Sequence, residues 1–114
     1  WNVFINGGRI PTRLNTIKWS QQVEQLGAGE ILLTSMNNDG TKEGFALDIT
    51  RQVSAAINIP VIASGGAGKR EDFKNLFEQT TATGGLAASI FHYNEVPISD
   101  LKEYLNLQKI AIRL

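Results

Sequence analysis

The chain has 114 residues, a length that suits one domain or part of one. Its 42% of hydrophobic and 19% of charged residues are typical of an ordinary globular protein. Eleven basic residues balance eleven acidic ones, so the net charge of zero provides no general attraction for nucleic acid or for an anionic membrane. The absence of cysteine excludes disulfides, thiolate metal sites and thiol catalysis. No apolar run approaches the ~20 residues of a membrane span and no signal-peptide pattern opens the chain, so we expect a cytoplasmic protein.

The first residues read as the middle of a strand. The only methionine is Met36, and the β-prone run at residues 1–5 ends at a turn signal in residues 6–8. A processed protein could also begin this way, but we expect a fragment of a longer one. Pro11 and Thr12 are expected to continue the loop after the turn.

Four segments carry apolar residues at the spacing of an amphipathic helix, and glycine follows the first of them as a stop signal. A shorter helical turn is expected over residues 90–93, and the apolar end at residues 110–114 is too short to assign. The predicted helices are 15–26 with Trp19, Val23 and Leu26 on the inward face, 48–57 with Ile49, Val53 and Ile57, 70–79 with Phe73, Leu76 and Phe77, and 99–107 with Leu101, Tyr104 and Leu105.

Three apolar runs that do not alternate lie between these helices, at residues 30–34, 60–64 and 85–89. Such runs are typical of parallel strands that are buried on both faces. Pro60 opens its run, where a proline removes no ladder hydrogen bond. Alternation of strand and helix predicts an α/β fold with right-handed crossovers. An open doubly wound sheet and an arc of a barrel both remain, because composition does not separate them.

The turns after the three strands could carry chemistry, because ligands of parallel α/β proteins bind at the carboxyl ends of the strands. These turns are rich in glycine and small hydroxyl residues, and their backbone amides at helix starts can bind phosphate without a cationic side chain. The turns are Thr34 to Thr41, Ser64 to Gly68, and Ala88-Ser89 leading into the helical turn.

Each of these features also has a purely structural interpretation. The run Gly65-Gly66-Ala67-Gly68 by itself is equally a tight turn; it is no dinucleotide fingerprint, since Glu71 stands at the third glycine position, and no Walker loop. Asp39 belongs to ordinary turn chemistry and gains interest only from its place at the ligand-binding end. His92 is the sole histidine, which favours a packing or surface role. Glu24, Asp48, Glu71 and Asp100 read as helix-surface or cap residues, and Glu30 as a solvated strand start.

Three segments together resemble the cyclase subunit of imidazole glycerol phosphate synthase, over nearly the whole chain and in the right order. The sister isomerase of histidine synthesis shares the Asp-Gly-Thr and Ser-Gly-Gly elements, whereas the run from Ala87 to His92 favours the cyclase. The segments are Gly27 to Met36 with Asp39-Gly40-Thr41-Lys42 after it, Pro60 to Gly68, and Leu86 to His92, which resemble the sixth-, seventh- and eighth-strand regions of that barrel.

The resemblance implies that residues 1–114 are the C-terminal portion of a single phosphate-binding (β/α)8 (TIM) barrel, with about three core parallel strands, their helices and a leading hairpin. It implies a cyclase that converts a bis-phosphorylated ribulosyl formimino nucleotide and ammonia into imidazole glycerol phosphate and aminoimidazole carboxamide ribotide. It implies no cofactor and no metal, and a glutaminase partner that delivers ammonia through the N-terminal face of the barrel. The implied residues are Asp39 as catalytic, Gly40, Gly65, Gly66, Ala88 and Ser89 for phosphate, Thr34 and Ser64 at the barrel mouth, and Glu30 at the ammonia entrance.

Two departures limit what the resemblance implies. The family's acid and base are aspartates on strands one and five, which would both lie upstream of Trp1. Asn37 stands where the family usually has aspartate. We therefore expect this chain to bind phosphate but to be inactive alone. The sister isomerase and a stand-alone phosphate-binding half-barrel that dimerises remain as alternatives.

Overall fold

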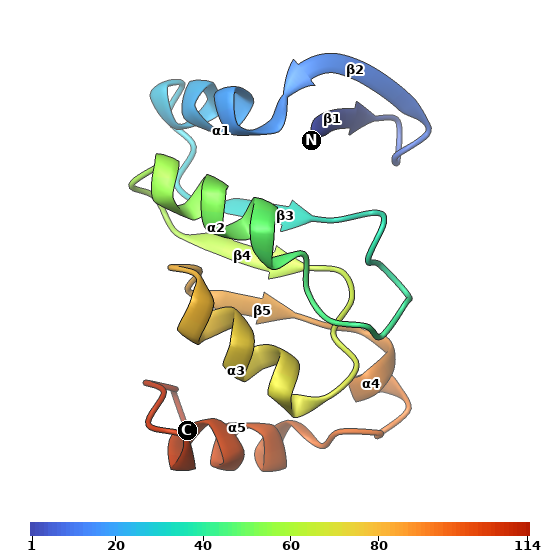
Figure 1. Cartoon of the computed structure of the whole chain (residues 1–114), viewed down its shortest axis with the longest axis vertical. Helices are drawn as coiled ribbons and strands as arrows, with labels where there is room; N and C mark the ends of the chain where they lie inside the picture. Colours follow the sequence, from blue (N-terminus) through green and yellow to red (C-terminus); the bar gives the residue numbers. More distant parts are fainter.

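The structure, a computed structural model, describes residues 1–114 as an antiparallel hairpin followed by a three-stranded parallel sheet with helices. Strands β3, β4 and β5 lie in that order, each followed by a helix (Figure 1). The elements are β1 Asn2–Ile5, β2 Ile10–Asn15, α1 Thr16–Gln25, β3 Ile31–Thr34, α2 Leu47–Ala56, β4 Val61–Ser64, α3 Arg70–Gln79, β5 Gly84–Leu86, α4 Ser89–His92 and α5 Ile98–Leu107.

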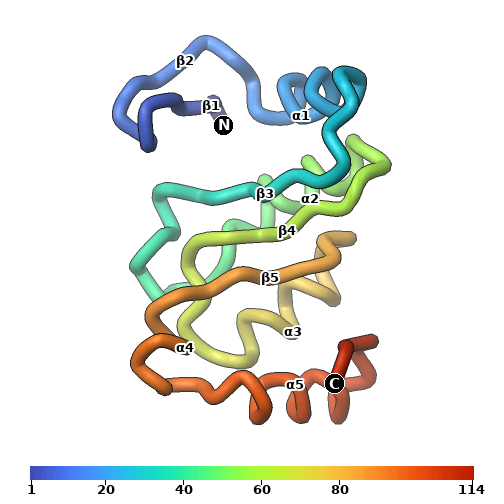
Figure 2. The backbone as a smooth tube through the Cα atoms, turned by 180° about the vertical axis from the view of Figure 1, so that it is seen from behind, coloured from blue at the N-terminus to red at the C-terminus, as the bar shows by residue number.

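The helices cover only one face of the parallel sheet. Val61 and Ala63 of β4 are 1% exposed beneath them, and α2 and α3 lie in front of the sheet in Figure 1. From behind, Figure 2 shows the opposite face of the three strands with no helix over it. A doubly wound sheet carries helices on both faces, whereas a barrel carries them only outside. The α/β prediction is therefore confirmed, and the sheet is an arc of a (β/α)8 barrel.

The inner face of the arc consists of side chains from alternate positions. In the parallel register Leu32 pairs with Ile62, and Thr34 pairs with Ser64, which pairs with Leu86. Leu32 is 57% exposed and Leu86 is 44% exposed. The expectation of strands buried on both faces is therefore wrong for this face, because nothing in the chain packs against it.

The core between sheet and helices consists of two clusters. In one of them, Ile49, Val53 and Ile57 of the α2 region pack on Val61, as the helical spacing predicted. In the other, Phe73, Leu76, Leu101 and Leu105 are buried, while Phe77 and Tyr104 pack partly buried against them. These contacts hold α3 and α5 side by side.

Four sequence-based assignments differ from the structure. Pro11 and Thr12 lie in β2 and not in a loop, because the chain turns back at residues 6–9 and pairs with β1. Leu26 is 75% exposed, because α1 ends at Gln25 and places Ile17 and Ser20 toward the core. The strand expected at residues 85–89 ends at Leu86, and the expected helical turn begins one residue early, at Ser89. The segment 110–114, which the sequence left unassigned, forms no strand, and its Ile110 and Ile112 pack against the larger cluster.

No helix of the structure combines the length and the apolar character needed to cross a membrane.

A pair of leucine truncations tests this packing. Leu76 is fully buried and Leu26 is 75% exposed. We expect Leu76→Ala to lower the free energy of unfolding by about 3 kcal/mol, because it leaves a cavity in the core. The matched control Leu26→Ala should change it by less than about 0.5 kcal/mol. Urea unfolding followed by tryptophan fluorescence measures both values, and equal losses would contradict the assigned core.

Candidate functional site

Three loops gather at the carboxyl ends of β3, β4 and β5, on the right side of Figure 1. We call them the first loop (residues 35–46), the glycine turn (residues 65–69) and the third loop (residues 87–88). They come together because parallel strands in register end at the same edge of the sheet. All three turns singled out from the sequence therefore lie at one edge.

The first loop is attached to the glycine turn by a chain of hydrogen bonds. The Ser35 amide donates to the Ser64 carbonyl at 3.1 Å, which continues the ladder past the end of β3. The Ser35 hydroxyl donates to Asn38 Oδ1 at 2.9 Å, and Asn38 Nδ2 donates to the Gly44 carbonyl at 3.1 Å. The Gly44 amide then donates to the Gly66 carbonyl at 2.8 Å. The two loops therefore form one connected unit.

The glycines of the turn allow the backbones of the two loops to touch. Gly66 has φ of 111°, and a Cβ there would overlap the Gly44 carbonyl oxygen. Gly65 has φ of 94°, and a Cβ there would lie 2.6 Å from the Ser35 carbonyl oxygen. Both positions therefore need glycine for the left-handed conformation and for the close approach.

Asp72 occupies the amides at the start of α3. Its Oδ2 accepts hydrogen bonds from the amides of Gly68 at 2.8 Å and Lys69 at 3.0 Å. Asp72 is the third residue of the helix and is only 6% exposed. This role of Asp72 was not predicted from the sequence, although an acidic residue at the third helical position is a signal for it. The amino end of α3 is thus already satisfied by a carboxylate of its own chain.

The amides of Gly65, Gly66 and Ala67 remain free. All three residues are buried, and none of their amides donates a hydrogen bond within the chain. Because buried amides in native proteins almost always have an acceptor, free ones are suited to bind an anion. The amides of Gly40, Ala88 and Ser89 likewise donate to no acceptor of the chain; Gly40 lies on the first loop, Ala88 on the third loop, and Ser89 is the first residue of α4.

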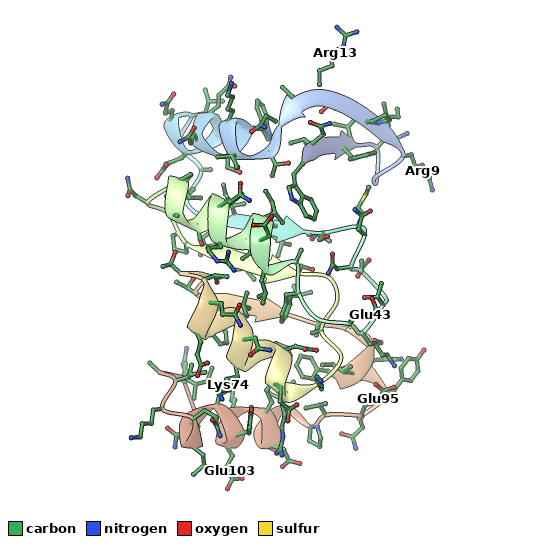
Figure 3. All side chains as sticks on the ribbon, viewed as in Figure 1. Arg9, Arg13, Glu43, Lys74, Glu95 and Glu103 are labelled. Atoms are coloured by element: carbon green, nitrogen blue, oxygen red, sulfur yellow. The ribbon has the colours of Figure 1, made fainter.

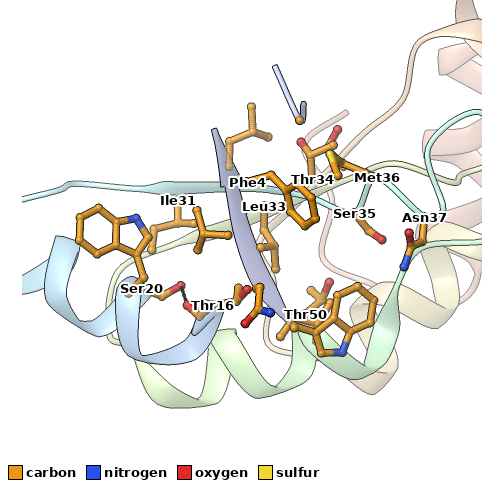
Figure 4. A pocket seen from close by; sticks show the side chains of 18 of the residues that line it. Phe4, Thr16, Ser20, Ile31, Leu33, Thr34, Ser35, Met36, Asn37 and Thr50 are labelled. Carbon is orange, nitrogen blue, oxygen red and sulfur yellow. Dashed lines mark hydrogen bonds between the residues drawn. The ribbon is translucent and has the colours of Figure 1, made fainter. Parts of the chain in front are cut away.

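A cavity of about 880 Å³ lies between the leading hairpin, α1 and β3 (Figure 4). Thr34, Ser64 and Asp39 line it together, with Asn37 beside them. Asp39 is exposed, and its amide donates to the Ser35 carbonyl at 2.9 Å. The structure thus places the two implied mouth residues and the implied catalytic Asp39 around one space. The residues implied for phosphate, which are Gly40, Gly65, Gly66, Ala88 and Ser89, do not line it.

Glu30 and His92 lie apart from this cavity. Glu30 precedes β3 at the opposite end of the sheet and borders a shallower cavity of about 610 Å³ with Ile62 and Leu86. His92 is exposed at the end of α4, with its ring 4.9 Å from that of Tyr93. The surface interpretation of His92 fits this position.

Parallel βα units with helices on only one face of the sheet define part of a (β/α)8 barrel. A family model described as "Histidine biosynthesis protein" matches residues 2–97, and the chain belongs to this family. Among its relatives are proteins named imidazole glycerol phosphate synthase subunit HisF, from Clostridium botulinum strain Okra (58% identical), Hydrogenobaculum sp. (53%) and Lachnoclostridium phytofermentans (51%). Each matches all 114 residues of this chain, which covers 45%, 45% and 44% of them. The chain therefore spans less than half the length of these relatives.

Two glycine substitutions distinguish the cost of a strained backbone from the cost of a steric overlap. Gly66→Ala meets both a positive φ and the Gly44 carbonyl, whereas Gly27→Ala meets φ of 104° with no atom within 4 Å. We expect Gly27→Ala to cost roughly 1 kcal/mol of stability and Gly66→Ala about 2–4 kcal/mol. Chemical denaturation measures the difference, and equal costs would show that the first loop yields easily.

Proposed function

We propose that this chain supplies the second phosphate-binding site of the cyclase subunit of imidazole glycerol phosphate synthase. The observation that carries the proposal is the set of free amides at the carboxyl edge of the sheet, those of Gly65, Gly66 and Ala67 above all. An anion there would accept hydrogen bonds from the glycine turn and from both flanking loops. The names of the relatives favour the cyclase over the sister isomerase.

The proposed substrate is bis-phosphorylated, with one phosphate held by this chain and the other by the remainder of the barrel. Thr34, Ser64 and Asp39 face the cavity in which the reacting part would lie. Asp39 would contact the substrate near the reacting centre, since its carboxylate accepts no hydrogen bond within the chain. If the family's two acid–base aspartates lie upstream of Trp1, as the resemblance implies, the chain alone should not perform the cyclisation.

We also propose a glutaminase subunit as the partner. Ammonia would enter at the amino ends of the strands, where Glu30 precedes β3, and would travel along the inner face toward the cavity. The relatives are named as subunits, which favours an assembly of more than one chain. A charged ring at the barrel entrance, with Glu30 as one member, would bind the partner or admit ammonia.

Phosphate titration tests the proposed site. In amide-resolved NMR of the 114-residue chain, inorganic phosphate should shift the amides of Gly66, Ala67 and Ser89. The amides of Gly68 and Lys69 should shift much less, because Asp72 already accepts their hydrogen bonds. Sulfate should shift the same amides as phosphate, and chloride should not shift them. Shifts confined to Gly68 and Lys69, or no shifts at all, would contradict the site.

Asp39→Asn tests the catalytic role. In a full-length protein that contains this segment, we expect kcat to fall by about 10²-fold, because the change removes a negative charge beside the reacting centre. Glu43→Gln, on the same loop, is the matched control and should leave kcat within about twofold. An unchanged kcat in Asp39→Asn would remove Asp39 from the mechanism. Measurable ammonia-dependent cyclisation by the 114-residue chain would contradict the need for the upstream aspartates.

A stand-alone half-barrel that dimerises is the second candidate. The observation that favours it is the open inner face, where Leu32 and Leu86 are 57% and 44% exposed, together with the unpaired outer edges of β3 and β5. A discrete dimer in analytical ultracentrifugation, together with phosphate binding, would support this candidate. A monomer that binds phosphate would favour the first candidate, a segment of the cyclase subunit.

A further inference from the structure

A single ion pair of the structure joins residues that are distant in the sequence. Lys42 Nζ lies 2.7 Å and 3.0 Å from the two carboxylate oxygens of Glu95, so the ammonium donates to both. The other two pairs, Arg70–Glu71 and Lys74–Glu78, join neighbours on α3. The pair between Lys42 and Glu95 therefore connects separate parts of the fold.

The backbone places both side chains of this pair. Lys42 has φ of 57°, and its carbonyl packs so closely on Gly68 that a Cβ there would overlap it. Glu95 follows Asn94, which has φ of 54° and ends the turn after α4. Positive φ is uncommon outside glycine, so both turns have a defined shape. The Lys42 side chain leaves the first loop from a position where its backbone already touches the glycine turn.

The ion pair between Lys42 and Glu95 thus adds another connection, which joins the first loop to the segment after α4. Figure 3 labels Glu43, the neighbour of Lys42, and Glu95 on the same side of the molecule, with Glu95 in the segment after α4. The first loop carries Gly40, and α4 begins at Ser89. Lys42 and Glu95 accordingly join the first loop to the segment after α4, the helix whose first amide, that of Ser89, is free.

We propose that Lys42 and Glu95 act as positioning residues for the anion site. Their ion pair, which we call the strap, sets the spacing between the amides of Gly40 and Ser89 on either side of the glycine turn. Donors held at the right spacing before the anion arrives lose less conformational freedom on binding. This proposal rests on the proposed phosphate function and adds two residues to its site.

A direct attraction between Lys42 and the phosphate predicts a different result. If only charge acted, removal of the Lys42 charge would weaken phosphate binding, and removal of the negative Glu95 charge would strengthen it. The strap predicts that either removal weakens binding, because each breaks the same pair. Whether removal of the Glu95 charge weakens or strengthens phosphate binding therefore decides between the strap and a direct attraction.

The experiment compares Lys42→Met and Glu95→Gln in the 114-residue chain, with inorganic phosphate as the probe. We expect each variant to raise the Kd about two- to fivefold, the range for a half-exposed ion pair of good geometry. The double variant should bind phosphate no more weakly than the weaker-binding single variant does. The exchanged pair, Lys42→Glu with Glu95→Lys, should return the Kd to within about twofold of wild type.

Hydrogen exchange without phosphate provides an independent measurement. The amides of Thr41 and Gly44 donate within the two connected loops, and both should exchange about two- to fivefold faster in either single variant. Lys74→Met, which breaks the pair with Glu78 on the α3 surface, is the control. It should change neither the Kd for phosphate nor the exchange rates of these amides.

The outcomes separate the two proposals. Tighter phosphate binding by Glu95→Gln, or unchanged exchange in both variants, overturns the strap. If the wild-type chain binds no phosphate, the proposed function fails, and faster exchange in both variants still supports a strap between the loops.

Discussion

The contact between the first loop and the glycine turn is the constraint on which the rest of the site depends. The backbone of Gly44 lies so close to Gly66 that no side chain fits between them. That closeness allows the hydrogen bond from the Gly44 amide to the Gly66 carbonyl, and it buries the turn. A turn buried under a neighbouring loop keeps its remaining amides away from water, which strengthens their attraction for an anion.

The amides of the site come from the turns more than from the ends of helices. Asp72 neutralises the start of α3 through two hydrogen bonds, so the amides of Gly68 and Lys69 are already satisfied. The free donors are therefore the ones just before them. The helix start is thus stabilised by its own carboxylate, and the donors of the turn have no acceptor within the chain.

The open inner face is the part of the sheet that has no packing partner within this chain. The helices and the outward side chains of the strands form a packed core, as the full burial of Val53 and Leu76 shows. The inward side chains of Leu32 and Leu86 have no partner in the chain, which spans less than half the length of its relatives. The first loop and the glycine turn, by contrast, are held to each other by hydrogen bonds within this chain.

The sequence by itself determined the helices at 48–57 and 70–79 to within one residue, the parallel order of the strands and the edge at which the loops meet. Local periodicity and turn residues are sufficient for these features, because they act between near neighbours in the chain. Only the tertiary structure decided that the strand after residue 84 is short, that Leu26 faces solvent and that one face of the sheet is open. It also decided which groups are paired and which amides stay free, because partners such as the Gly66 carbonyl for the Gly44 amide and Glu95 for Lys42 come from distant segments whose meeting no local pattern encodes.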